Sequence, residues 1–428
     1  MRLLVIGINY APDLIGVAKY NSEMCEGLAA LGHDVRIVTA PPYYPDWVVP
    51  AEYRSLWYAR DRARGVDLIR APIYVPKSPS GLKRLVHHGS FLLSASAPVL
   101  SSALRWRPDI VVAVAPSLLS AMLAVTAARI ANAPCWLHVQ DFEVDAAFEL
   151  GLLGTNARAR ALMLGLERRL MDAFDHVSTI SPQMLRCLRR KGLSAEKLSE
   201  FRNWIDTDAI APGTSATCFR AQLGLGASDV IALYSGAMSN KQGLDLVIDM
   251  ASGLRGRSSL HFVLCGNGPV KPELIRMAEG LANVHFLDLQ PSERLSELLS
   301  TADIHLLPQK AQISDLVLPS KLAGILASGR PVVAMAAPGS GIAEEIDGAG
   351  LLVSPGDVGA LSAAVVRLAE DEEMRATLGR VARIRARQNW DRSAVIRGIE
   401  REFAALAECR PTKQPRTSAE SRPLPSAD

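Results

Sequence analysis

Short apolar segments recur along almost the whole chain and alternate with stretches of helical spacing. In the first half, we expect strands at Leu3–Ile8, Val35–Thr39, Asp67–Pro72, Ile110–Ala115, Trp136–Val139 and Val177–Ile180. In the second half, we expect strands at Val230–Ser235, Leu260–Cys265, Val284–Leu287, Ile304–Leu307, Val332–Met335 and Leu351–Val353. Nearly continuous Val, Ile and Leu runs are typical of parallel strands that helices cover on both faces. The pattern therefore predicts an α/β protein with doubly wound parallel sheets.

The length of the chain predicts more than one domain. With 428 residues, the chain is too long for one ordinary hydrophobic core. We expect a Rossmann-like domain at residues 1–203 and a second at residues 204–390, because the turn-rich segment Asp208–Ser215 follows the first set of strands. A further helix is expected at Asp391–Cys409. Residues 410–428 contain four prolines and no aromatic residue, so they are predicted to be disordered.

Charge and hydropathy exclude some classes of protein. The formal net charge is only +3, which does not indicate a nucleic-acid partner. The N-terminus has the pattern of a strand rather than a signal peptide, because Asn9 and Asp13 interrupt its apolar run. No apolar run reaches the roughly 20 residues that span a bilayer. The six cysteines lie far apart with no CxxC pair, which fits reduced thiols, so we expect a cytoplasmic protein.

The segment Leu318–Ala334 has the most informative local pattern. An extended Leu-Pro-Ser-Lys precedes a helix that we expect at Lys321–Ser328, and a buried strand follows. Unpaired N–H groups at a helix N-terminus favour anions, and Ser320 and Lys321 would add a hydroxyl and a cation. With Pro319, these residues are candidate ligands of a diphosphate. An ordinary helix cap is the alternative.

Two more strand-to-helix loops of the second half contain glycines. One holds Gly236 and Lys241, and the other holds Gly266 and Gly268. Backbone amides and one lysine can bind a phosphate, although neither loop has the GxxxxGK[ST] pattern. Each loop alone is a weak signal. Together with residues 318–321, they predict a phosphate-binding site in the second domain.

The loop after the first strand is a candidate binding site in the first domain. It contains Asn9, Tyr10, Asp13 and Gly16, and a helix is expected to follow it at Asn21–Leu31. Proline and glycine in such a loop let the backbone approach a ligand closely. A plain strand-to-helix connection is the alternative.

A histidine near the end of another strand is the candidate catalytic residue. His138 precedes the polar residues Gln140 and Asp141. We predict that His138 and Asp141 project into a cleft between the domains, whereas a buried core histidine is the alternative. Asp141 and Glu143 do not predict a metal site, because no second cluster has ligand spacing. Four arginines, at positions 380, 383, 385 and 387, are interpreted as a solvated helix face.

Five segments together resemble the family 4 glycosyltransferases of the GT-B fold, over roughly residues 1–405. They are Asn9–Pro12, Thr39–Pro45, Tyr74–Leu85, Val139–Asp145 and Leu318–Ala334. Among that family they are most similar to exopolysaccharide enzymes of the colanic-acid type. The resemblance implies two Rossmann-like domains with a cleft between them and a final helix that crosses back. It also implies a sugar transfer that retains anomeric configuration and needs no metal ion or other cofactor.

The resemblance also implies roles for particular residues. The donor, GDP-fucose or another GDP- or UDP-sugar, would be held by Gly16, Gly236, Lys241, Gly266, Gly268, Asp315, Pro319, Ser320 and Lys321. The acceptor would contact Asn9, Tyr10 and Asp13. His138 matches the family's cleft histidine, and Asp141 follows it. The implied acceptor is a lipid-linked oligosaccharide repeat unit, which places the enzyme at the inner face of the bacterial cytoplasmic membrane.

One segment of the first half fits such a membrane location. Residues 77–104 begin with Lys77, Lys83 and Arg84 and continue as an apolar stretch that Pro98 interrupts. A segment of this kind is typical of a helix that lies in the bilayer interface, and its cations favour anionic lipids. A buried helix that follows a surface loop is the alternative.

The chain departs from the family pattern at the donor site. Gly236-Ala237 stands where family 4 enzymes commonly have Gly-Arg, and Gly324 takes the place of the second glutamate of the Glu-x7-Glu motif. Asp315 is the one carboxylate near the first glutamate position. These departures keep open the alternative of a catalytically silent sugar-nucleotide-binding or assembly subunit. A separate alternative is a GT-B nucleotide-sugar epimerase, which would use paired acids at the cleft and need no acceptor.

Overall fold

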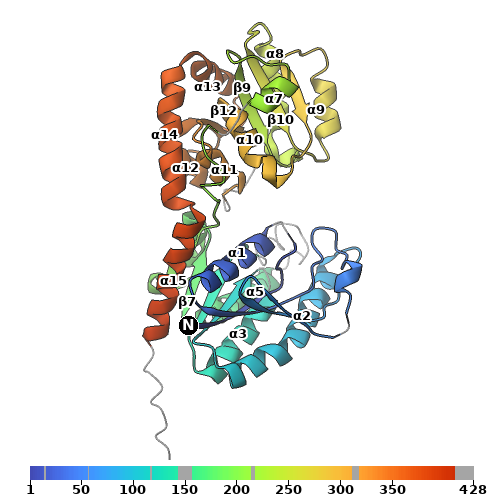
Figure 1. Cartoon of the computed structure of the whole chain (residues 1–428), viewed down its shortest axis with the longest axis vertical. Coiled ribbons are helices and arrows are strands. Elements are labelled where there is room, and N and C mark those ends of the chain that lie inside the picture. Colours follow the sequence, from blue (N-terminus) through green and yellow to red (C-terminus); the bar gives the residue numbers. More distant parts are fainter. Residues whose placement is uncertain are drawn as a thin grey trace, which may run out of the picture.

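The computed structural model describes residues 1–13, 16–55, 57–115, 118–142, 157–213, 217–310 and 318–409. They form two α/β domains that follow one another along the long axis of the molecule (Figure 1). Helices α14 (Glu372–Asn389) and α15 (Arg392–Glu408) run along one side and connect the domains. Two predictions concern residues outside the described ones. They are the donor contact of Asp315 and the disordered tail at residues 410–428.

The first domain is built on an eight-stranded sheet with the order β3-β4-β2-β1-β5-β6-β7-β8. Its strands are β1 (Arg2–Gly7), β2 (Asp34–Thr39), β3 (Ala59–Ala63), β4 (Val66–Arg70), β5 (Ile110–Ala115), β6 (Cys135–Val139), β7 (His176–Thr179) and β8 (Leu198–Glu200). All neighbouring strands are parallel except β3 and β4. The helices are α1 (Val17–Ala30), α2 (Gly81–Ser101), α3 (Leu118–Ala131), α5 (Ala157–Asp172) and α6 (Pro182–Arg190).

The second domain is built on a parallel sheet of six strands with the order β11-β10-β9-β12-β13-β14. These strands are β9 (Val230–Ser235), β10 (Leu260–Cys265), β11 (Val284–Leu287), β12 (Ile304–Leu307), β13 (Val332–Met335) and β14 (Gly350–Val353). Its further helices are α7 (Thr217–Gln222), α8 (Leu244–Gly253), α9 (Lys271–Met277), α10 (Leu295–Thr301), α11 (Lys321–Ala327), α12 (Gly341–Ile346) and α13 (Val358–Glu370).

The strand orders confirm the predicted doubly wound fold. In both sheets the connections reverse direction beside the first strand, next to β1 in one domain and β9 in the other. Ligands of such sheets bind outside the carboxyl ends of the strands at this reversal point. All twelve predicted strands are present. The β3 and β8 strands were not predicted.

Helix α15 packs on the first domain, as the family resemblance implied. Ile396, Ile399 and Phe403 join the apolar cluster on one face of the first sheet, and the Phe403 ring lies 4.9 Å from the Trp136 ring. A Cβ atom at Gly27 of α1 would lie 2.7 Å from a methyl carbon of Ile396. Glycine at position 27 therefore allows α15 to lie close to α1.

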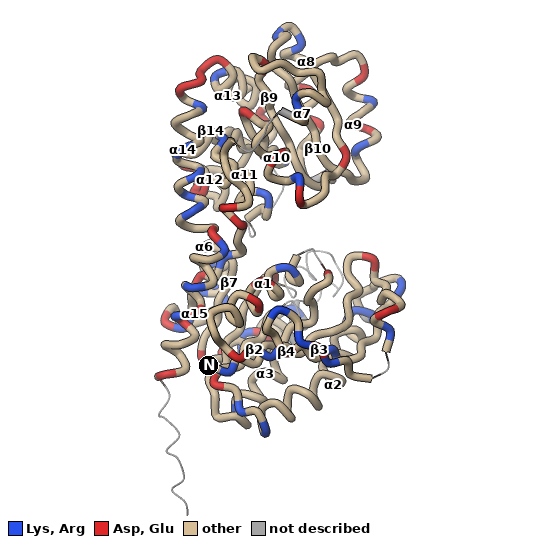
Figure 2. Tube along the Cα trace, viewed as in Figure 1, with Lys and Arg blue, Asp and Glu red and all other residues tan. Residues whose placement is uncertain are grey.

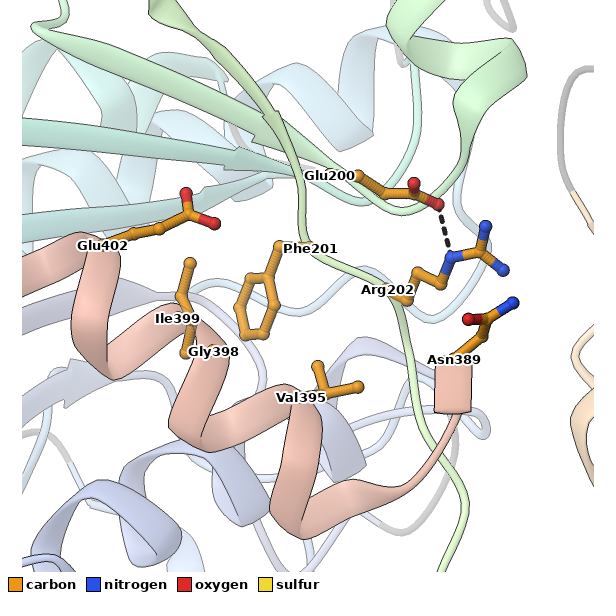
Figure 3. Close-up of a pocket in the computed structure, with 8 residues that line it drawn as sticks. All are labelled: Glu200, Phe201, Arg202, Asn389, Val395, Gly398, Ile399 and Glu402. Atoms are coloured by element: carbon orange, nitrogen blue, oxygen red, sulfur yellow. Dashed lines mark ion pairs between the residues drawn. The ribbon is translucent and has the colours of Figure 1, made fainter. Parts of the chain in front are cut away.

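Where the two domains meet, one arginine connects three segments. Arg202, in the linker after β8, pairs through Nε with Glu200 and through Nη1 with Glu345 of α12, both at 2.5 Å. Glu345 also accepts a hydrogen bond of 3.2 Å from the indole N–H of Trp390, between α14 and α15. Beside this cluster lies a pocket of about 160 Å³ (Figure 3), lined by Glu200, Phe201, Arg202, Asn389, Val395, Gly398, Ile399 and Glu402. None of the predicted site residues lines this pocket.

Candidate active site

The two glycine loops of the second domain are joined to each other. The N–H of Gly236, directly after β9, donates to the carbonyl of Cys265 at 2.9 Å, and the N–H of Met238 donates to the carbonyl of Asn267 at 2.9 Å. Both loops leave the carboxyl ends of neighbouring strands, so they meet beside the reversal point of the sheet. The two loops thus form one surface.

Glycine is required at two positions to keep these loops together. A Cβ atom at Gly266 would collide with the carbonyl oxygen of Gly236, and one at Gly268 would collide with that of Met238. Their φ angles, 151° and 158°, are also unfavourable for residues with a side chain. The glycines predicted to bind the donor therefore have a structural role that the sequence did not reveal.

Lys321, the first residue of α11, reaches the first of these loops. Its ammonium nitrogen lies 3.1 Å from the Tyr234 hydroxyl and 3.0 Å from Oε1 of Gln242. It also lies 3.4 Å from the point where a Cβ atom of Gly236 would be. Lys321 is thus placed at the glycine loop that the sequence predicted to bind phosphate.

The electrostatics of Lys321 favour an anionic ligand. Burial lowers the pKa of its ammonium from 10.5 to about 8. Within the described part of the chain, Lys321 forms no ion pair with a carboxylate, and its partners Tyr234 and Gln242 are uncharged. A buried charge without a counter-ion is costly. A phosphate oxygen would remove this cost by forming a charged hydrogen bond with the Lys321 ammonium. This position can therefore bind the diphosphate of a nucleotide.

The other predicted donor residues of this domain contribute less to the described geometry. Ser320 is exposed and precedes α11, but its side chain does not cap the helix. Pro319 is half-buried, and its carbonyl accepts from the N–H of Leu322 at 2.9 Å. The backbone of Lys241 lies in a short 3-10 turn, Asn240–Gln242, but its side chain is outside the described residues. The role of Lys241 stays a prediction.

In the first domain, the predicted acceptor loop is held by buried polar residues. Asp13 is 7 % exposed, and the backbone N–H groups of Tyr43 and Tyr44 and the Asn9 side chain face its carboxylate and favour the charged form. Burial raises the pKa of its carboxyl group, and these polar neighbours oppose the rise. Tyr10 is 2 % exposed and belongs to the apolar core. Asp13 thus connects the loop after β1 to the loop after β2.

Arg70, which the sequence did not single out as a site residue, connects the same two loops. Its guanidinium donates to the carbonyl of Ala40 at 3.1 Å and to that of Ala11 at 2.5 Å. The side chain is largely buried, and burial lowers its pKa. The sequence could have indicated Arg70 as a site residue, because it lies near the carboxyl end of a predicted strand.

Gly16 belongs to the loop after β1, and Asp141 follows β6, which is separated from β1 by β5 in the sheet. Gly16 has a φ of 63° and caps α1, and nothing lies within 4 Å of its Cβ position. Asp141 is exposed just after β6, and its carboxylate accepts from the N–H of Phe142 at 2.8 Å. Both residues are accessible at the carboxyl ends of their strands, where ligands of such sheets bind.

His138 lies inside β6, where it is 3 % exposed. Its Nδ1 lies 2.9 Å from the Ser178 hydroxyl, and its Nε2 lies 3.0 Å from the amide nitrogen of Gln140. Burial lowers the pKa of His138 to about 3, so the ring is neutral. Both ring nitrogens are occupied by protein partners. This placement favours the alternative of a buried core histidine, and catalysis by His138 stays a prediction.

The two doubly wound domains have the architecture of the GT-B fold, and the paired loops are its candidate nucleotide site. The solved structures that this chain resembles include sucrose-phosphate synthase from Thermosynechococcus elongatus, with a TM-score of 0.71, 20 % identity, and 96 % and 100 % of the two chains covered. They also include HepE from Anabaena in complex with UDP, with a TM-score of 0.67, 18 % identity, and 95 % and 100 % coverage. Because both structures are at most 20 % identical in sequence to this chain, their similarity shows a shared fold and no more.

Sequence comparison identifies the family. Residues 16–204 match the glycosyl transferase 4-like domain, and residues 229–371 match the glycosyl transferases group 1. WcaI of Escherichia coli (strain K12), provisionally named a colanic acid biosynthesis glycosyl transferase, is 41 % identical over 374 residues, which are 85 % of this chain and 91 % of WcaI. The chain belongs to the family 4 glycosyltransferases, and it is an enzyme of that class.

Proposed function

We propose that this glycosyltransferase moves a sugar from a GDP- or UDP-sugar, such as GDP-fucose, to a lipid-linked exopolysaccharide repeat unit with retention of anomeric configuration. The observation that carries the proposal is the buried ammonium of Lys321, which has no described carboxylate partner and lies at the paired glycine loops. A nucleoside diphosphate would supply the missing negative charge. The provisional name of the relative WcaI supports an exopolysaccharide acceptor.

The chemistry of transfer explains why a fixed cation is useful. The bond between the anomeric carbon and the diphosphate oxygen breaks, a bond to an acceptor hydroxyl forms, and the hydroxyl proton is released. Negative charge grows on the departing diphosphate, and preorganised donors aimed at that charge lower the barrier. In this proposal Lys321 and those loop N–H groups that do not already donate to a backbone carbonyl serve that purpose without a metal ion or other cofactor. Transfer should then persist in EDTA.

A donor screen tests this proposal. The protein is incubated with GDP- and UDP-sugars, with and without lipid extract from a polysaccharide-producing bacterium, and nucleotide release is measured. Release that depends on the extract, with a labelled sugar appearing in the lipid fraction, is the expected result. Conversion of the donor sugar without an acceptor would instead support an epimerase.

A catalytically silent sugar-nucleotide-binding or assembly subunit is the second candidate function. It is favoured by Gly324 of α11, a buried residue at the position where the family has its second glutamate. A Cβ atom there would lie 3.2 Å from a methyl carbon of Leu299, so there is little room for a larger side chain. Nucleotide-sugar binding without turnover of any donor would support this candidate.

A lipid-linked acceptor requires contact with a membrane surface, for which α2 is the proposed element. Among the described residues, no helix has both the length and the apolar character needed to cross a bilayer. Lys83, Arg84, Leu85, Val86 and Leu93 are nevertheless exposed on α2. The helix contains no acidic residue, as the absence of red along α2 in Figure 2 also shows. We propose peripheral binding through residues 77–104 at the inner face of the bacterial cytoplasmic membrane.

Flotation with liposomes tests this contact. Binding should need anionic lipid and should weaken as salt is raised, because salt screens surface charge. Lys83→Glu combined with Arg84→Glu should weaken it further. Absence of binding at every salt concentration would remove the main support for a lipid-linked acceptor.

A further inference from the structure

Beside α2, β3 and β4 form a short hairpin that the proposed function has not used. Strand β3 pairs with β4 alone and forms one edge of the first sheet. Ala59, Arg60, Asp61 and Arg62 are exposed along it. Just before β3 lies Trp57, whose exposure of 78 % is the highest among the large apolar side chains of the described residues. One exposed apolar side chain is ordinary on a protein surface, so Trp57 gains meaning only together with other exposed apolar residues near it.

The arginines of β3 lie on the same face of the sheet as α2. In the antiparallel register, Arg60 is opposite Ile69 and Arg62 is opposite Asp67. Residues opposite each other in such a pair project from the same face. Ile69 belongs to the same apolar cluster as Phe91 of α2. Arg60 and Arg62 therefore project from the face that α2 covers.

A hydrogen bond fixes the hairpin beside the exposed part of α2. The Tyr58 hydroxyl donates to the carbonyl of Ser94 at 2.8 Å. Trp57 precedes Tyr58, and Leu93, which is 77 % exposed, precedes Ser94. Two highly exposed apolar side chains thus flank one hydrogen bond between the hairpin and the helix.

The charge of this region favours an anionic bilayer as its partner. No acidic residue occurs between Asp67 and Asp109, so α2 adds cations and no anions to the surface. In β3, Asp61 alternates with Arg60 and Arg62 and projects from the opposite face. Trp and Tyr side chains are enriched at the headgroup level of membranes, and arginines near the surface are attracted to anionic lipids.

We infer that the β3 hairpin, through Trp57, Arg60 and Arg62, is a second contact with an anionic bilayer alongside α2. The inference rests on the proposed membrane contact of α2. It adds a defined orientation, because a helix and a sheet edge that are held together fix the angle between the first domain and the bilayer.

Tryptophan fluorescence with brominated lipids tests the role of Trp57. Vesicles of phosphatidylcholine with phosphatidylglycerol are prepared with bromine in the upper part of the acyl chains, so that they quench tryptophans that reach the interface. Quenching is expected for the wild type and should be lost in Trp57→Phe. Equal quenching in both proteins, or none in the wild type, would overturn the inference.

A charge-reversal pair tests the two arginines. Arg60→Glu with Arg62→Glu should weaken partitioning onto anionic vesicles by at least about tenfold. Arg380→Glu with Arg387→Glu, two exposed positions on α14, changes the net charge equally and should have little effect. Equal weakening by the two pairs would mean that net charge alone is responsible, which contradicts the inference. These assays measure vesicle binding and not sugar transfer. A failure of the membrane contact can therefore be distinguished from a failure of the proposed reaction.

Discussion

The ammonium nitrogen of Lys321 lies 3.1 Å from the hydroxyl oxygen of Tyr234 and 4.1 Å from the centre of its ring. The hydroxyl donates its own hydrogen to the carbonyl of Ala237 at 2.6 Å, so it accepts from the ammonium. This contact connects the start of α11 to the first glycine loop. It supplies a cation close to Ala237, where family 4 enzymes commonly carry an arginine.

Removal of this cation should impair the enzyme. A charged hydrogen bond contributes roughly 1.5–3 kcal/mol, so Lys321→Ala should lower kcat/KM by about tenfold to a hundredfold. Lys310→Ala is a suitable control, because Lys310 is a half-exposed lysine of the same domain that pairs with Asp245. Turnover at the wild-type level in folded Lys321→Ala would exclude Lys321 from the donor site. Lys241→Ala, measured in parallel, tests the other predicted lysine.

Binding of the nucleotide should depend on pH in a defined direction. The pKa of Lys321 is about 8 in the free protein, and a bound diphosphate stabilises the charged form. Affinity for GDP or UDP should therefore be high near pH 7, where the diphosphate and Lys321 are both charged, and fall by up to about tenfold per pH unit above pH 8. Calorimetry in buffers of different ionisation enthalpy should detect proton uptake on binding above that pH. A constant affinity up to about pH 9.5 would contradict the assignment.

The same lysine should destabilise the unliganded protein. Because its folded pKa of about 8 lies below the ordinary 10.5, the unfolded chain binds more protons between these values, and stability rises with pH in that window. Lys321→Met removes the buried charge and should raise the unfolding free energy at pH 7 by roughly 2–3 kcal/mol. Urea denaturation at about pH 7 and pH 10 tests this. A gain that is equally large at both pH values would show that charge is not its cause.

The glycine loops provide a steric test. Gly268→Ala places a methyl group against the carbonyl of Met238, so it should separate the loops, weaken nucleotide binding and lower the melting temperature. Gly256→Ala is the matched control, because nothing lies within 4 Å of its Cβ position and its φ is not unusual. If Gly268→Ala bound nucleotide as well as Gly256→Ala does, the paired loops would not form the site.

Most of the fold could be predicted because buried parallel strands have apolar sequences. Strand β5 (Ile110–Ala115) is buried at all six positions and was recognised from its Val and Ile content. Strand β3, with the sequence Ala-Arg-Asp-Arg-Ala, was missed because an edge strand can be charged on both faces. Strand β8 has only three residues, which is too short for an alternating pattern to be detected.

The site was predicted less completely, because its contacts join distant parts of the chain. The sequence placed Lys321 and Gly236 in one site, but Tyr234 and Gln242, which hold Lys321, have no motif of their own. The interpretation of Arg383 as part of a solvated helix face was wrong. Its guanidinium donates to the carbonyls of Thr207, Ile210 and Ala327 at 2.6–2.8 Å. These hydrogen bonds connect α14 to the linker between the domains. Spacing along one helix cannot reveal such partners.

The buried position of His138 gives a prediction that separates packing from catalysis. The Gln140 amide donates to Nε2, so the hydrogen on Nδ1 is directed at Ser178, which also accepts from the Trp136 indole at 2.8 Å. His138→Ala would leave these groups unpaired and open a cavity, so it should lower the unfolding free energy by about 2–4 kcal/mol.

His305→Ala is the matched comparison for this test. His305 is also fully buried, burial lowers its pKa to about 3, and its ring contacts the Ser328 hydroxyl at 3.1 Å in the second domain. If His138 is a core residue, both variants should lose similar stability, and kcat should be nearly unchanged when it is measured well below the melting temperature. In addition, the pH profiles of kcat/KM for the wild type and His138→Ala should have the same shape near pH 6.5. The His138 ring is already neutral at that pH, so its removal cannot abolish an inflection there. A loss of kcat of about a hundredfold in His138→Ala, with His305→Ala unaffected, would instead establish the catalytic role that the sequence predicted.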